Sequence, residues 1–140
     1  MSKIKVAING FGRIGRVFTR AVLKNSSIEI VAINDLVETP TLAHLLKYDS
    51  VHGTLNKKVS CTDSSISVDD ITIKVFNERD PENLPWSHLG IDVVVESTGV
   101  FRSMLGAQKH VTAGAKKVII SAPATDSEVK TIVMGINDHL

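Results

Sequence analysis

The chain has 140 residues and a formal net charge of +1, and this length fits one domain covering residues 1–140. The balanced charge gives no reason to expect a nucleic acid or an anionic membrane as a partner, and the apolar runs are too short to cross a bilayer. The residues after Met1 lack the pattern of a signal peptide, and a single cysteine is typical of a reducing compartment, so a cytoplasmic location is expected.

The first predicted elements form a strand–turn–helix unit. Residues 3–9 alternate and then become fully apolar, which is typical of a strand buried on both faces of a parallel sheet. Residues 11–24 follow a helical period, and the segment Asn25-Ser26-Ser27 ends the helix. The apolar stripe of this helix consists of Ile14, Val17, Phe18, Ala21 and Val22. Its basic residues lie mostly opposite and are expected to form a solvated face: Arg13, Arg16, Arg20 and Lys24.

A second strand and a second helix follow. Residues 28–33 form another buried strand. Thr39 is then expected to be a helix N-cap, with Pro40 at the first helical position. The leucines of the following turns, from Leu42 to Leu46, place an apolar face on this helix.

The pattern then changes to short alternating segments. Residues 57–61, 66–68 and 71–75 alternate apolar with polar side chains, and Asp69-Asp70 is typical of a tight turn. These segments predict an antiparallel ribbon inserted between strand–helix units. Asp80-Pro81 predicts the capped start of a short helix that ends near Trp86.

The rest of the chain returns to strands that alternate with helices. Strands are expected at residues 91–96, 117–120 and 131–134, and a helix at about 103–113 that stops at Gly114. Such alternation implies right-handed crossovers between parallel strands. The predicted fold class is therefore α/β, a Rossmann-type doubly wound, mostly parallel sheet with an inserted antiparallel ribbon.

Three glycines join the first strand to the first helix. Gly10, Gly12 and Gly15 form Gly-x-Gly-x-x-Gly, which is weak alone but informative between a buried strand and an amphipathic helix. Gly10 permits a tight turn, Gly12 lets a pyrophosphate approach the backbone, and Gly15 lets the helix pack close to the strand. The free main-chain N–H groups of Arg13 and Ile14 would face the phosphates. A glycine-rich turn without a ligand is the alternative.

Asp35 strengthens the case for a dinucleotide. It ends the second strand, about twenty residues beyond Gly15, where such folds need an acceptor for the ribose hydroxyls. Its charge would repel a 2′-phosphate, and no lysine or arginine follows until Lys47, so NAD is predicted over NADP. The alternative is a turn or helix-cap role for Asp35.

Other loops follow predicted strands at the edge of the sheet where α/β folds bind ligands. Arg79 lies in one of them and could contact an adenine ring or pair with Glu78 or Asp80. Thr98-Gly99 offers a hydroxyl and a close backbone, and Ser121 offers a hydroxyl near the nicotinamide side.

The sequence gives little sign of a metal site or a reactive thiol. The histidines lie far apart and a single cysteine cannot form Cys-x-x-Cys, so no metal is expected. Cys61 lies in the alternating ribbon with no histidine beside it to activate the thiolate. We therefore expect Cys61 to be a small buried structural residue.

Five blocks of sequence resemble a known family. They read KVAINGFGRIGR, AINDL, LLKYDSVHG, VVVESTGVF and GAKKVIISAPA. In this order they resemble the N-terminal half of the bacterial-type glyceraldehyde-3-phosphate dehydrogenases, from Lys3 to about Asn137.

The resemblance implies the NAD-binding domain of a glycolytic enzyme. In that family a cysteine thiol attacks glyceraldehyde 3-phosphate, a hydride passes to NAD, and phosphate releases the acyl group as 1,3-bisphosphoglycerate. The family enzyme is a cytoplasmic homotetramer. Its NAD contacts match Arg13, Ile14, Asp35, Arg79 and Ser121 here. Further positions lining the same groove are Asn9, Gly10, Gly12, Asn34, Thr98, Gly99 and Phe101.

The chain departs from the family where catalysis is concerned. The catalytic motif Ser-Cys-Thr-Thr-Asn and the catalytic domain are not in this sequence, so it has no predicted catalytic residue and is expected to bind NAD without reacting. Ser60-Cys61-Thr62 matches only part of that motif, because Asp63-Ser64 follow. Two alternatives are the cofactor domain of an erythrose-4-phosphate dehydrogenase and a stand-alone nucleotide-binding or interaction module.

Overall fold

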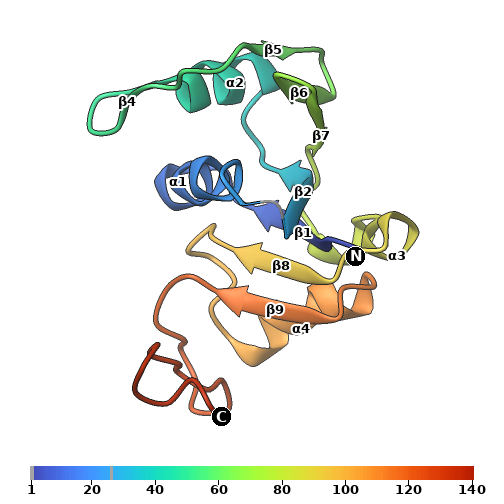
Figure 1. Ribbon diagram of the computed structural model, residues 1–140. Coiled ribbons are helices and arrows are strands. Elements are labelled where there is room, and N and C mark those ends of the chain that lie inside the picture. The colour runs from blue at the N-terminus through green and yellow to red at the C-terminus, as the bar shows by residue number, and fades with distance from the viewer. Residues whose placement is uncertain (1, 26) are drawn as a thin grey trace.

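A computed structural model describes residues 2–25 and 27–140 of the chain (Figure 1). Its strands are β1 Ile4–Asn9, β2 Ile28–Asn34, β3 Tyr48–Asp49, β4 Gly53–Thr54, β5 Val59–Cys61, β6 Ser65–Val68, β7 Ile71–Phe76, β8 Val93–Glu96 and β9 Lys117–Ile120. Its α-helices are α1 Arg13–Val22, α2 Thr39–Lys47, α3 Trp86–Leu89 and α4 Met104–Thr112, and Pro81–Asn83 form a 3₁₀ turn, η1.

The main sheet is mostly parallel, as predicted. Its seven strands lie in the order β5-β6-β7-β2-β1-β8-β9. The pairs from β7 to β9 are parallel, whereas β5, β6 and β7 pair antiparallel and form the predicted ribbon. From β1 the chain first builds the β2 side of the sheet and later crosses to β8 on the other side. The strand order therefore reverses between β1 and β8, which is where doubly wound sheets bind ligands.

The central strands β1, β2 and β8 are buried on both faces toward their carboxyl ends, as their apolar runs predict. Neighbouring residues of β1 point to opposite faces, so Val6 and Ile8 join one hydrophobic cluster while Ala7 joins the other. The first cluster includes Leu42 and Leu46 of α2, and the second includes Trp86 of α3. The helices thus cover both faces and leave the strand ends free for loops (Figure 1).

The buried side of α1 differs from the predicted stripe. Gly15, Thr19 and Val22 are the buried positions of the helix, whereas Ile14 is 53 % exposed and Ala21 is also exposed. The reason is the close approach at Gly15, which turns this narrow face of the helix toward β1. The predicted helix end at Asn25-Ser26-Ser27 includes Ser26, which lies outside the described residues.

Arg20 does not lie on a solvated face, so that prediction is wrong. Its guanidinium donates to the carbonyl oxygens of Leu46 at 2.7 Å, Lys47 at 3.2 Å and Gly53 at 3.0 Å. The last carbonyls of a helix have no partner within the helix, and here Arg20 supplies one at the end of α2. The arginine thereby fastens α1 to α2 and to the β3–β4 hairpin.

The start of one helix and the extent of another also differ from the prediction. The N-cap of α2 is Glu38, and Thr39 instead donates its hydroxyl to the Asp63 carbonyl at 2.8 Å, which ties the helix to the ribbon. Asp80 does cap η1 by accepting from the Glu82 amide. The predicted helix ending at Trp86 is wrong, because Pro85 interrupts the segment and Trp86 begins α3.

The predicted strand at residues 131–134 is wrong as well. This segment pairs with no strand in the described residues, and Ile132, Val133 and Met134 are 46 %, 47 % and 80 % exposed. The Val133 amide donates to the side chain of Asn137 at 2.6 Å, so a local turn replaces a ladder bond. Within residues 2–25 and 27–140, no helix has the length and apolar character needed to cross a membrane.

Candidate functional site

A cavity of about 430 Å³ lies at the carboxyl ends of the central strands. The loops after β1, β2, β7 and β8 meet there. The lining residues are Asn9, Gly10, Gly12, Asn34, Asp35, Leu36, Glu78, Arg79, Ser97, Thr98, Val100 and Phe101. A larger cavity of about 550 Å³ lies near the start of β2, beside Ile28 and Lys3, and none of these loops reaches it. The smaller cavity is therefore the candidate site.

The three glycines of the turn differ in what surrounds them. Gly10 has a φ of +91°, and a Cβ there would lie 2.7 Å from the Thr98 nitrogen. A Cβ on Gly15 would lie 2.5 Å from the Gly10 oxygen. Both observations confirm the predicted tight turn and the close packing of helix on strand. At Gly12, by contrast, no heavy atom of the described residues beyond its immediate chain neighbours comes within 4 Å of an added Cβ.

The open space at Gly12 adjoins the amino end of α1. Gly12 is the N-cap of this helix, and no side chain among the described residues caps it. Arg13 and Ile14, the next two residues, are exposed. Uncapped amides at a helix start, together with the helix dipole, attract an anion. The turn therefore combines room for a ligand with donors for a phosphate.

Asp35 contributes a carboxylate beside the glycine turn. Its Oδ2 accepts from the Phe11 amide at 2.7 Å, and its Oδ1 accepts from the Val37 amide at 2.9 Å. The bond to Val37 is the turn role that the sequence left as an alternative. The bond to Phe11 holds the glycine turn against the end of β2. Each carboxylate oxygen can accept a second hydrogen bond, so these contacts leave Asp35 able to bind a hydroxyl.

Asn34 fixes the loop that follows β7. Its Nδ2 donates to the Glu78 carbonyl and its Oδ1 accepts from the Glu78 amide, each at 2.8 Å. This pair of hydrogen bonds brings the next residue, Arg79, into the lining of the cavity. Asp80, which the sequence offered as a partner for Arg79, instead pairs with Lys109 at 3.3 Å.

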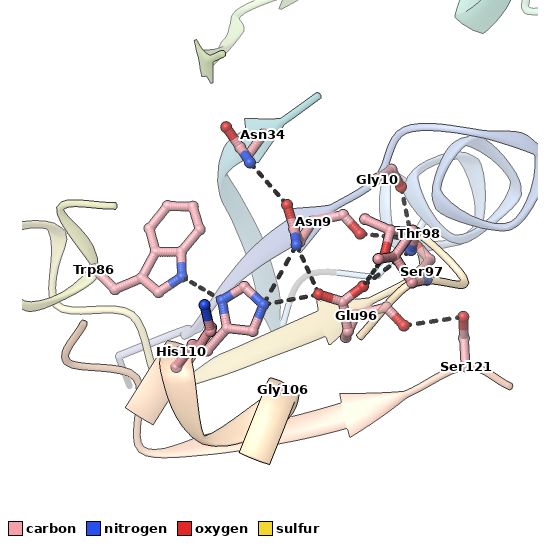
Figure 2. A network of polar contacts seen from close by, with 12 residues as sticks. Asn9, Gly10, Asn34, Trp86, Glu96, Ser97, Thr98, Gly106, His110 and Ser121 are labelled. Atoms are coloured by element: carbon pink, nitrogen blue, oxygen red, sulfur yellow. Dashed lines mark hydrogen bonds and ion pairs between the residues drawn. The ribbon is translucent and has the colours of Figure 1, made fainter. Parts of the chain in front are cut away.

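A buried polar network lies beneath the cavity (Figure 2). Glu96 at the end of β8 is 2 % exposed and accepts from Asn9 at 2.6 Å and from the Thr98 hydroxyl at 2.6 Å. His110 of α4 lies 2.9 Å from the same carboxylate. Burial raises the pKa of Glu96, but the hydrogen bonds from His110, Thr98 and Asn9 outweigh burial and lower this pKa below its usual value.

Not all predicted residues line the cavity. Arg13 and Ile14 follow the lining residue Gly12, but they and Gly99 are not part of the wall. Ser121 follows β9 and donates its hydroxyl to the Glu96 carbonyl at 3.2 Å, so it lies outside the wall too (Figure 2). Four lining residues were not among the predicted contacts, although each adjoins a predicted one in its loop: Leu36, Glu78, Ser97 and Val100.

Cys61 is exposed, so its prediction as a buried residue is wrong. It ends β5, an edge strand with a neighbour on one side only, and it does not line the cavity. Across the described part of the chain, no group of three or more histidine, cysteine or acidic side chains could hold a metal ion.

The fold and the site together define a class of protein. A parallel sheet with reversed strand order, a glycine turn opening onto a helix start, and a carboxylate at the end of the second strand are the features of a dinucleotide-binding α/β domain.

Comparison with known proteins identifies the family within this class. Residues 4–104 match the family model described as "Glyceraldehyde 3-phosphate dehydrogenase, NAD binding domain", and the chain belongs to this family. The chain is 60 % identical over 133 residues to glyceraldehyde-3-phosphate dehydrogenase 1 of Bacillus cereus, which covers 95 % of this chain and 40 % of that protein. It is 60 % identical over 134 residues to the Geobacillus stearothermophilus enzyme, covering 96 % of this chain and 40 % of the relative. The Mycoplasma pneumoniae enzyme is 58 % identical over 137 residues, covering 98 % and 41 %. The chain thus spans about 40 % of the length of these relatives.

Proposed function

We propose that residues 1–140 form one domain that binds NAD in the cavity at the carboxyl ends of β1, β2 and β8. The observation that carries this proposal is the open space over Gly12, next to the uncapped start of α1. A diphosphate fits this position because it needs both an unobstructed backbone and main-chain donors. In this arrangement the amides of Arg13 and Ile14 donate to the diphosphate, and Gly10 shapes the turn.

The adenosine half of NAD lies on the β2 side in this proposal. Asp35 accepts from the ribose hydroxyls, and Arg79 lies against the adenine. Asp35 favours NAD over NADP because its negative charge opposes a 2′-phosphate. Arg79 is the one cationic side chain among the described lining residues, so it acts in the opposite direction on NADP.

The nicotinamide half lies on the β8 side in this proposal. Thr98 and Phe101 line this part of the cavity, whereas Asn9 at the end of β1 and Asn34 at the end of β2 are buried at the floor of the whole cavity. Gly99 and Ser121 complete the set of contacts, and their assignment rests on the match with the family motif. Bound NAD supplies a hydride acceptor, and the residues of this chain hold and orient it.

The whole protein is proposed to be a phosphorylating glyceraldehyde-3-phosphate dehydrogenase. The high identity to three enzymes of that name supports this proposal. A homotetramer in the cytoplasm and a reacting cysteine outside residues 1–140 belong to the same proposal. Cys61 does not fit that reacting role, because it ends an edge strand of the ribbon.

Calorimetric titration of the chain with NAD and with NADP tests the proposed site. We expect NAD to bind more tightly than NADP, and AMP to compete with NAD for the same cavity. The absence of any heat of binding at millimolar NAD would refute the proposal. For the whole protein, parallel assays with glyceraldehyde 3-phosphate and erythrose 4-phosphate decide between the two dehydrogenase activities.

A further inference from the structure

The walls of the cavity share one buried anchor. Glu96 Oε2 accepts from both the amide and the hydroxyl of Thr98, at 3.0 and 2.6 Å. Glu96 Oε1 accepts from Asn9 at 2.6 Å, and Asn9 Oδ1 accepts from Asn34 at 2.8 Å. The side chain of Asn34 in turn binds the backbone amide and carbonyl of Glu78. One carboxylate therefore connects the loop after β8 with the loop after β7 on the opposite wall. Figure 2 shows the part of this connection that runs from Thr98 through Glu96 and Asn9 to Asn34.

The far side of the network fixes the proton on His110. The indole N–H of Trp86 donates to His110 Nδ1 at 3.0 Å, and an indole nitrogen can only donate. His110 Nδ1 is therefore unprotonated, and Nε2 carries the hydrogen that points to Glu96 at 2.9 Å. Asn9 Nδ2 and His110 Nε2 lie 3.4 Å apart as two donors aimed at the same oxygen.

This arrangement requires an acid at position 96. All four groups facing the carboxylate are donors: the Asn9 amide, the His110 ring, and the amide and hydroxyl of Thr98. Only a carboxylate accepts on both oxygens, whereas a glutamine would turn an N–H toward at least one of these donors. Together these four donors satisfy the acceptor capacity of the buried carboxylate.

We propose that Glu96 is a positioning residue of the dinucleotide site. It holds Thr98 directly and Glu78 indirectly, through Asn9 and Asn34, so that the two loops keep the spacing that NAD requires. This inference rests on the proposed function. Glu96 itself does not line the cavity, so it acts on the ligand only through these neighbours.

The test compares three variants with the wild-type chain by calorimetry with NAD, together with thermal unfolding. Glu96→Gln should weaken NAD binding about tenfold or more, because the Thr98 and Asn9 walls lose their common acceptor. Trp86→Phe is the matched control, since it removes a donor from the same network on the side away from the cavity. It should lower the melting temperature but leave the NAD affinity within about threefold of wild type.

The third variant exchanges the acid and the amide. In Asn9→Asp/Glu96→Gln, the carboxylate at position 9 accepts from Asn34, His110 and the amide at position 96, whose oxygen accepts from Thr98. The donors of Asn34 and Thr98 again have acceptors, whereas the His110 Nε2–H must turn from position 96 to the carboxylate at position 9. NAD affinity should therefore recover in part and rise about threefold or more above that of Glu96→Gln. Should Glu96→Gln fail to fold, the double variant carries the test and must fold and bind NAD.

Several results would overturn the inference. One is a wild-type affinity for NAD in Glu96→Gln. Another is a loss of NAD affinity in Trp86→Phe as large as that in Glu96→Gln. The last is a double variant that binds NAD no better than Glu96→Gln or does not fold. Each of them leaves the proposed function intact, provided that the wild-type chain binds NAD. Absence of NAD binding by the wild-type chain would refute the proposed function and this inference with it.

Discussion

Alanine at position 10 should mainly lower the stability of the domain, whereas alanine at position 12 should mainly weaken NAD binding. At Gly10 the backbone has a φ of +91°, where an L-residue costs roughly 1–2 kcal/mol. The new Cβ would also lie 2.7 Å from the Thr98 nitrogen and 2.8 Å from the Ser97 carbonyl carbon. Both neighbours are backbone atoms that cannot rotate away, so overpacking adds roughly 1–3 kcal/mol.

The total for Gly10→Ala is about 2–5 kcal/mol, a large share of the roughly 5–15 kcal/mol that stabilises a domain. The melting temperature should fall by roughly 6–20 °C. Gly12 has a φ of −79° and open space around an added Cβ, so Gly12→Ala should cost only about 1 kcal/mol or less, because alanine is a poorer N-cap than glycine. Its methyl group would, however, occupy the path of the diphosphate and weaken NAD binding about tenfold or more.

Thermal unfolding followed by circular dichroism and calorimetric titration with NAD measure the two effects separately. Gly10→Ala should have a clearly lower melting temperature, and Gly12→Ala should melt close to the wild type but bind NAD poorly. Wild-type NAD affinity in Gly12→Ala would show that the diphosphate does not cross this residue. A wild-type melting temperature for Gly10→Ala would show that the turn is not as tight as described.

Three more changes test the rest of the site and the fold. Asp35→Asn should weaken the binding of NAD by roughly 1.5–3 kcal/mol. It should also reduce the difference in affinity between NAD and NADP, because no carboxylate then opposes the attraction of Arg79 for the 2′-phosphate. Calorimetry with both cofactors checks this. The pKa of Glu96 is lowered in the fold, so its stabilisation is present above the unfolded pKa of about 4.3 and is lost as pH falls through the folded value. Melting curves from pH 7 to pH 3 should therefore converge for wild type and Glu96→Gln at low pH. Arg20→Met should lower stability by about 1–2 kcal/mol through the carbonyls at the end of α2, with NAD affinity unchanged.

Local patterns were sufficient for the elements that frame the site. The change from alternation to a helical period, with glycines between, located β1 and α1. Ser103 caps α4 by accepting from the Gly106 amide, and Gly114 follows that helix with a φ of +118°, so both ends were readable from single residues. These features are set by neighbours within about four residues, which a sequence displays directly.

Elements that depend on a distant partner were not readable in this way. Residues 131–134 have the β-branched composition of a strand, but a strand forms only where another strand offers free donors and acceptors. Arg20 has the helical spacing of a solvated residue, yet the free carbonyls at the end of α2 lie about 26 residues further along the chain. Cys61 alternates like a buried residue, but its strand lies at the edge of the sheet.

The network under the cavity combines both situations. Glu96 ends a fully apolar strand, where an acidic residue ordinarily marks the first solvated position, and His110 is a lone histidine in a helix. They meet only because α4 packs against the sheet beside β9, and the indole of Trp86 comes from a third element, α3. A buried acid is stable only when donors converge on it, so its burial and its partners must be specified together. The one local sign was the sequence Glu-Ser-Thr-Gly, in which a charged residue stands between the buried strand and the turn. Because the donors that hold Glu96 come from residues 9, 98 and 110, the site depends on the register of β1 with β8 as much as on the glycine motif.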